Sequence, residues 1–155
     1  MYYADLTEYS YVPSYARPGL LNVGWLDGAH EYPVKIPSGE FVEALWRICH
    51  HGLAVMRGFH ACESCDPQAD ELTVATLHGV SLYLGFFEIR AFSGTGQAFA
   101  APSLVFHYVV AHHYAPPAKF VDAVVNGPQP GTSEYARLLE HHSEAEDLFR
   151  KKLGP

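Results

Sequence analysis

The chain has 155 residues, a formal net charge of -7, and 48% hydrophobic and 14% aromatic residues. This length fits a single domain over residues 1–155, and the apolar content excludes a disordered chain. The acidic balance argues against a nucleic-acid partner, which would require a clustered basic face, and no apolar run approaches the ~20 residues that span a bilayer.

Residues 1–37 are rich in tyrosine and are interrupted by four prolines. We expect an irregular N-terminal arm that packs on the core, because so many tyrosines would be costly to leave exposed. Within this arm, residues 21–26 are a candidate short strand. Ser38 is a good N-cap for a helix over residues 39–51, and Cys49 falls on the apolar stripe of that helix as a small packed hydrophobe.

The middle of the chain predicts antiparallel strands. Residues 53–56 are a candidate strand that leads into a cysteine-containing turn. Residues 72–77 and 80–92 predict a β-hairpin, and residues 97–101 predict a third strand after a glycine-containing turn. Three consecutive strands joined by tight turns indicate an antiparallel meander.

The last third of the chain predicts helices. Residues 104–110 form an apolar segment, and the two prolines at 116–117 start a helix that stops at residues 126–128. Ser133 is expected to cap a final helix that ends near the basic residues 150–152, where cations complement the helix dipole.

The predicted fold is therefore α+β, with a small antiparallel sheet packed with about four helices. Residues 1–37 supply the arm that wraps on the core. Residues 38–101 supply the first helix, the sheet and the cysteine turn, and residues 102–155 supply the helical C-terminal part.

The strongest chemical signal is the pair Cys62 and Cys65. Two cysteines separated by two residues can bind one metal ion, because the turn between them brings both thiolates to a shared centre. The chain later supplies His107 and His112, so Cys-x2-Cys and His-x4-His match the ligand types and local spacings of structural zinc sites. Thiolate and imidazole together favour zinc over hard cations.

The fourth ligand is open between two histidines. His112 follows His107 by five positions, which is about 140° around an ideal helix. Both could face one ion only if the helix loosens before Tyr114, and His113 offers the next spacing. His60 competes with His112, because it lies two residues before the first cysteine and alternate residues of an extended segment project to the same side.

Two other readings of the cysteine pair lack a required neighbour. A thioredoxin-type redox pair is disfavoured because Asp66, directly after Cys65, opposes thiolate formation. A zinc deaminase would need a His-x-Glu element, whereas this chain has His-Ala-Cys beginning at His60. Metal binding is therefore the favoured chemistry of this segment.

Glu88 and Arg90 interrupt an otherwise apolar strand. By strict alternation they share a face with Leu84 and Phe86, whereas a bulge at Gly85 would turn them outward. We expect an exposed ion pair, and the alternative is a polar pair that lines a pocket.

Several segments resemble, in order, a family of short uncharacterised bacterial proteins, chiefly of the actinobacterial type. They are ADLT from residue 4, VGWL from 23, RGFHACESC from 57, EIR from 88, AP from 101, HYVV from 107 and HHYAPPAKF from 112. The resemblance covers about residues 3–126 and implies a single-domain layout without an established activity. It also draws attention to five residues at its motif positions: His60, Cys62, Cys65, His107 and His112.

We expect a soluble zinc-binding protein whose metal is structural and which acts by binding an unknown protein or small-molecule partner. The first residues lack the basic start and apolar core of a signal peptide, which predicts a reducing cytoplasm without a membrane partner. One alternative is a small metal-dependent hydrolase with an open zinc position. The other is a metal-free interaction or immunity-type protein.

Overall fold

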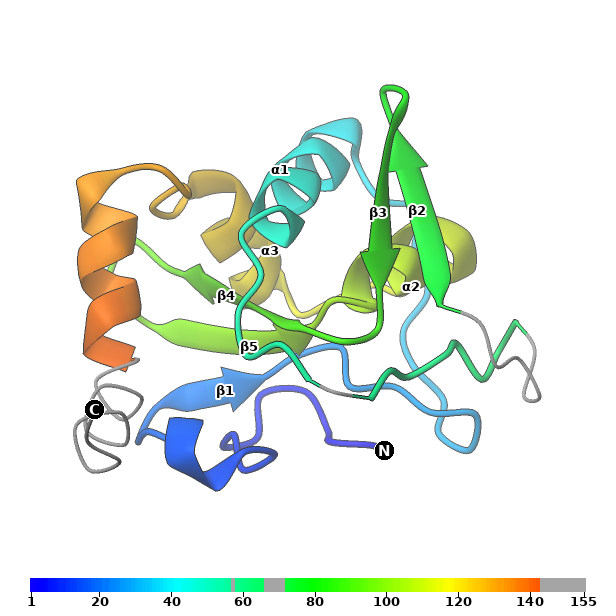
Figure 1. Ribbon diagram of the computed structural model, residues 1–155, viewed down its shortest axis with the longest axis horizontal. Coiled ribbons are helices and arrows are strands. Elements are labelled where there is room, and N and C mark those ends of the chain that lie inside the picture. Colours follow the sequence, from blue (N-terminus) through cyan, green and yellow to red (C-terminus); the bar gives the residue numbers. More distant parts are fainter. Residues whose placement is uncertain (57, 66–71, 143–155) are drawn as a thin grey trace, which may run out of the picture.

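The computed structural model describes residues 1–56, 58–65 and 72–142, and its fold is α+β, as predicted (Figure 1). The helices are a short 3-10 helix η1 (Pro13–Tyr15), α1 (Gly39–Cys49), α2 (Val105–His112) and α3 (Ala118–Asn126), and residues 133–142 are also helical. The strands are β1 (Leu20–Asn22), β2 (Thr73–Leu77), β3 (Val80–Leu84), β4 (Glu88–Phe92) and β5 (Ala98–Pro102).

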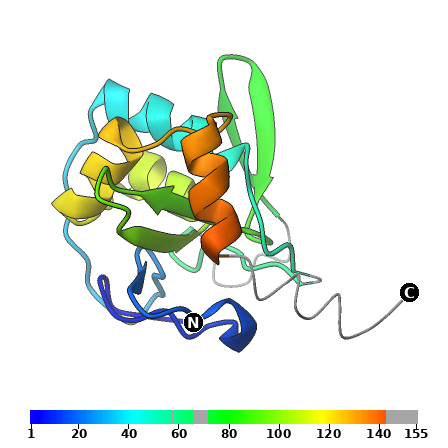
Figure 2. The same cartoon turned by 90° about the vertical axis from the view of Figure 1, so that its left-hand side faces the viewer.

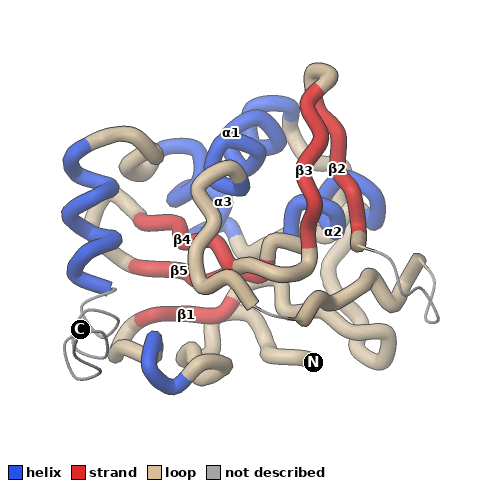
Figure 3. The backbone as a smooth tube through the Cα atoms, in the orientation of Figure 1, coloured by secondary structure: helices blue, strands red, loops and turns tan. Residues whose placement is uncertain are grey.

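The strands form two separate sheets rather than one meander, and this corrects the predicted topology (Figure 3). β2 and β3 are an antiparallel hairpin, while β4 pairs antiparallel with β5 and β1 pairs parallel with β5. The segment predicted as one long strand breaks after Leu84, because Gly85 adopts φ +101 and leaves the β region. The candidate strand at 53–56 contributes one isolated bridge, between Leu53 and Glu88.

Helices α1 and α3 cover the β4–β5 pair on one side, and the arm lies beyond β1 (Figures 1 and 2). Ser38 caps α1 as predicted, since its Oγ accepts a hydrogen bond from the Phe41 N–H at 3.2 Å. Cys49 is buried on the apolar stripe, and this burial raises the pKa of its thiol to about 12. α1 packs against α2, α3 and β4.

The N-terminal arm packs on the core, as expected from its tyrosines. Isolated bridges join Tyr3 to Trp25 and Glu8 to Leu21, so the first residues of the arm run alongside β1 and the residues that follow it. Tyr9 is buried in a second apolar cluster together with Leu20, Trp25, Phe92, Ala98, Ala100 and Tyr135. Aromatic packing therefore attaches this irregular segment to the sheet.

Glu88 and Arg90 form a buried ion pair, so the expectation of an exposed pair is wrong. Their side chains are 2% and 3% exposed, and Arg90 Nη1 donates to Glu88 Oε2 at 2.7 Å. Tyr9 Oη donates to the other carboxylate oxygen at 2.7 Å, and Tyr135 Oη donates to the Arg90 carbonyl oxygen at 2.8 Å. Burial and the Glu88 carboxylate raise the pKa of the Tyr9 hydroxyl well above its ordinary value. The arm and the last helix cover this face of β4, and strand alternation alone does not reveal that cover.

The C-terminal helices begin and end close to the residues predicted as start and stop signals. Pro117 stands at the N-cap of α3, which ends at Asn126 as expected. The last described helix begins one position earlier than predicted, because Thr132, and not Ser133, accepts a hydrogen bond from the Tyr135 N–H at 3.2 Å. The basic residues 150–152 lie outside the described residues. In the described part of the chain, no helix combines the length and the apolar character that a membrane span requires.

Candidate metal centre

The two cysteines lie on a segment without regular secondary structure, residues 58–65, which we call the knuckle. Its backbone is held by a bond from the His60 N–H to the Gly85 carbonyl at 2.7 Å and by a turn from the Cys65 N–H to the Cys62 carbonyl at 3.2 Å. A Cβ at Gly85 would lie 2.2 Å from the His60 carbonyl oxygen. Glycine is therefore required where the strand break and the knuckle meet.

The two histidines lie on α2, and the end of this helix determines their relation. His113 adopts φ +55 and ends the helix after His112. The N–H groups of His113 and Tyr114 both donate to the Tyr108 carbonyl, five and six residues back, instead of the four-residue spacing of an α-helix. This wider end places the Nε2 atoms of His107 and His112 only 3.2 Å apart. The helix thus ends before Tyr114, which was the condition for a shared centre.

The knuckle and α2 bring four candidate ligand atoms together. The Sγ atoms of Cys62 and Cys65 and the Nε2 atoms of His107 and His112 all lie within 4.8 Å of one another. The Sγ–Nε2 distances from Cys62 to His112 and from Cys65 to each histidine are 3.2 Å. A tetrahedral zinc ion with ordinary bond lengths separates sulfur from nitrogen by about 3.5 Å and two nitrogens by about 3.3 Å. The four atoms are therefore close enough to hold one metal ion.

The protein environment favours neutral ligands in the absence of a cation. Cys62 is buried, and this burial raises the pKa of its thiol. Burial also lowers the pKa of the His107 imidazole, and the neighbouring His112 acts in the same direction. Cys65 is exposed at the surface end of the cluster. A metal ion would replace the thiol protons and accept the lone pairs of neutral imidazoles.

His60 is not part of the cluster, contrary to the suggestion that it competes with His112. Its side chain is exposed, and its Nε2 lies 3.5 Å from the Tyr11 hydroxyl oxygen. His113 is also exposed and outside the group. The i, i+2 argument for His60 fails because the turn that carries the cysteines is not an extended strand.

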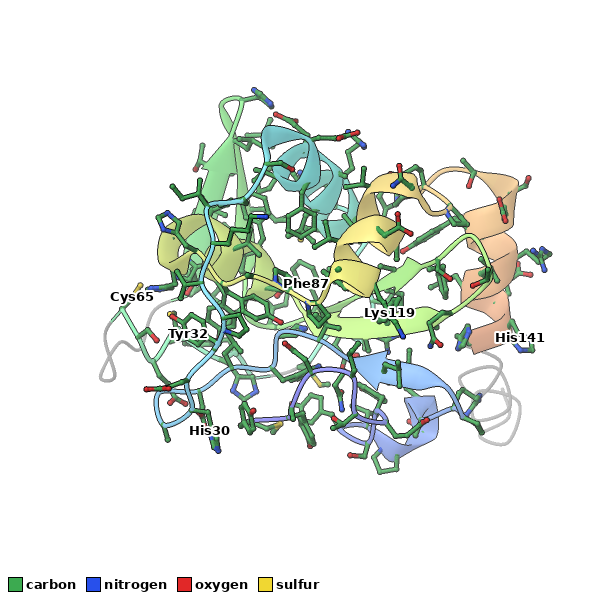
Figure 4. All side chains as sticks on the ribbon, turned by 180° about the vertical axis from the view of Figure 1, so that it is seen from behind. His30, Tyr32, Cys65, Phe87, Lys119 and His141 are labelled. Atoms are coloured by element: carbon green, nitrogen blue, oxygen red, sulfur yellow. The ribbon has the colours of Figure 1, made fainter. Side chains whose placement is uncertain are left out.

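Residues next to the ligands tie the knuckle to the arm, and the sequence reasoning did not identify them. Glu63 Oε2 accepts a hydrogen bond from the Gly28 N–H at 2.8 Å. Tyr108 lies beside His107 on α2, and burial together with the charges of Cys62 and Glu63 raises the pKa of its hydroxyl. Figure 4 shows Cys65, Tyr32 and His30 at one end of the molecule, with His141 at the other. The position of Glu63 between the two cysteines was the one sequence signal for this contact. Its partner Gly28 lies 35 residues earlier in the chain, so the sequence did not indicate the pairing.

The fold and the cluster define an α+β protein with a Cys2His2 group that could hold a metal ion. The chain belongs to the family described as Domain of unknown function (DUF7919), whose model matches residues 1–125 and so includes all four cluster residues. Membership confirms the resemblance to an uncharacterised family, while the bacterial origin stays a prediction. A search of curated proteins and a search of solved structures found no match.

Proposed function

We propose that this protein binds a zinc ion through Cys62, Cys65, His107 and His112, and that the ion is structural. The observation that carries the proposal is the convergence of four ligand atoms within 4.8 Å from two segments 42 or more residues apart. The spacing of histidines along the sequence does not explain this arrangement. In both histidines it is the Nε2 atom that lies close to the cysteine sulfurs.

The donor set supports zinc over other metals. Two thiolates and two imidazoles in a tetrahedral arrangement are typical of structural zinc, whereas magnesium and calcium prefer oxygen ligands. The charges also balance, because two thiolates neutralise a divalent cation. A reducing cytoplasm, which we propose as the location, keeps both thiols available for the metal.

A structural role is better supported than a hydrolytic one. Catalytic zinc keeps one coordination position for water or substrate, whereas the four protein atoms of this cluster, all within 4.8 Å of one another, would fill a tetrahedral shell around one ion. The ion ties the knuckle, which lacks regular secondary structure, to α2, which packs on α1. The protein then acts by presenting the stabilised surface to a partner or a small ligand.

Metal analysis of the purified full chain tests the proposal. We expect about one zinc ion per chain after expression with ample zinc, and less than ~0.2 per chain would refute it. Cobalt substitution should give the strong visible absorption of a tetrahedral site with two thiolates and two imidazoles. A spectrum of three protein ligands plus water would instead favour the hydrolase, and full stability in excess chelator would favour the metal-free interaction protein.

A further inference from the structure

A hollow of about 250 Å³ lies beside the metal cluster, where three parts of the chain meet. The arm contributes Trp25, the knuckle contributes Phe59 and Glu63, and α2 contributes Tyr108. Its size is slightly below the range of about 300–1,000 Å³ typical of ligand sites, so a small molecule or a single headgroup would fit it.

Three aromatic side chains line this hollow. Trp25 and Tyr108 are held in the protein, with 5% and 7% exposure, whereas Phe59 is 43% exposed. Trp25 is fixed further by its indole N–H, which donates to the Ala100 carbonyl oxygen at 3.2 Å. Aromatic faces attract cations, and several rings around one space are the usual means of binding a quaternary ammonium group.

One acidic side chain occurs among the described residues that line the hollow. Glu63 lines it, and one carboxylate oxygen accepts the Gly28 N–H at 2.8 Å, which fixes the group and leaves the other oxygen available. No lysine or arginine occurs among these lining residues, which also include Met1, with the amino group of the chain, and His60. A zinc ion bound by two thiolates and two neutral imidazoles adds no net charge beside the hollow.

Tyr108 adds a polar side chain to the same lining. Its hydroxyl makes no hydrogen bond to any other residue that the structure describes, although the tyrosine itself is buried. A free hydroxyl beside a carboxylate gives a ligand with a hydroxyl or an ammonium hydrogen a second polar contact.

We infer that this hollow binds a small organic cation of the alkylammonium or quaternary ammonium class. The rings of Trp25, Phe59 and Tyr108 contact the cationic group from the wall of the hollow, and Glu63 balances its charge. This inference goes beyond the zinc proposal, since it concerns a separate space whose wall continues from the metal ligands through Glu63 and Tyr108.

The test compares choline with 3,3-dimethyl-1-butanol, a neutral molecule of nearly the same shape, by NMR titration of the zinc-loaded full chain. A buffer of about pH 8 keeps ordinary histidines neutral, so that they do not repel the cation. We expect choline to bind about tenfold more tightly than the neutral analogue, because one cation–π contact accounts for about that factor. The indole N–H signal of Trp25 should shift, and that of Trp46 should not.

Two variants and one control locate the binding. Glu63→Gln keeps an oxygen for the Gly28 N–H and removes the charge, and Phe59→Ala removes an exposed ring; each should weaken choline binding at least threefold. Tyr83→Ala removes another exposed ring, 56% exposed on β3, and should leave binding unchanged.

Equal affinity for the two probes, or unchanged binding in Glu63→Gln, would overturn the inference. The absence of any shift up to about 50 mM choline would also overturn it, because the affinity would then be weaker than a specific small site allows. Zinc content, measured on the same samples, keeps this result separate from the metal proposal.

Discussion

Substitution of Cys65 by serine separates metal binding from every other role of this side chain. Cys65 is exposed and lies at the end of the knuckle, so Cys65→Ser creates no cavity and buries no hydroxyl. In the absence of metal, the free energy of unfolding should therefore change by less than about 0.5 kcal/mol. With zinc present, one of four ligands is lost.

The size of the zinc-dependent effect follows from linkage. Loss of groups that merely support a ligand weakens metal binding about 10- to 100-fold, so loss of a ligand should weaken it by about 100-fold or more. At a fixed free zinc concentration above both dissociation constants, a 100-fold weaker site lowers the apparent stability by about 2.7 kcal/mol. For a chain of this length, that corresponds to a Tm lower by about 5–11 °C.

The assay is thermal unfolding by circular dichroism, in zinc-buffered solution and again in excess chelator. Cys49→Ser is the control, because Cys49 is buried on α1 away from the cluster and its hydroxyl should cost about 1–3 kcal/mol with or without zinc. Equal Tm values for Cys65→Ser and the wild-type chain in zinc would refute ligation. An equal loss in zinc and in chelator would show that the thiol acts through packing alone.

The remaining predictions concern the arm and the strand break. Tyr9→Phe removes a hydrogen bond to the buried Glu88 carboxylate and should lower the free energy of unfolding by about 1.5–3 kcal/mol in urea titrations. In a Glu88→Gln background the loss should fall below about 1 kcal/mol. Equal losses in the two backgrounds would contradict an energetic coupling between the two side chains. Gly85→Ala places a Cβ 2.2 Å from the His60 carbonyl oxygen at φ +101, so we expect a loss above about 3 kcal/mol and weaker zinc retention by the same protein. Gly79→Ala is the matched control, because Gly79 has φ +75 and nothing lies within 4 Å of an added Cβ. It should cost only about 1 kcal/mol in the same titration, with zinc retained. Similar losses of stability for the two variants would rule out the clash with the His60 carbonyl.

Local patterns predicted the helices well and the sheet less well. The Ser38 cap and the apolar stripe of α1 are determined within a few residues, and the prolines before α3 act over a similarly short range. The strand from residue 80 to 92 was predicted as continuous, because its apolar residues continue through the break. Gly85 interrupts it, but a glycine in a strand pattern does not by itself reveal which sheet the next residues join.

The same limit explains the outcome for the polar residues. Glu88 and Arg90 looked like an exposed pair because their strand neighbours do not show that Tyr9 and the last helix cover them. The choice between His60 and His112 depended on the hydrogen bonds that end α2, and helical periodicity over five residues could not supply those.

The sequence by itself determined the chemistry available to this protein: two thiols separated by two residues, two histidines five positions apart that offer ring nitrogens, and an acidic chain. Only the tertiary structure decided which groups meet, because segments far apart along the chain are brought together by packing and not by local preference. Gly85 anchors the knuckle, and the widened end of α2 turns His107 and His112 to the same side. The four ligand atoms and the aromatic hollow beside them result from that packing.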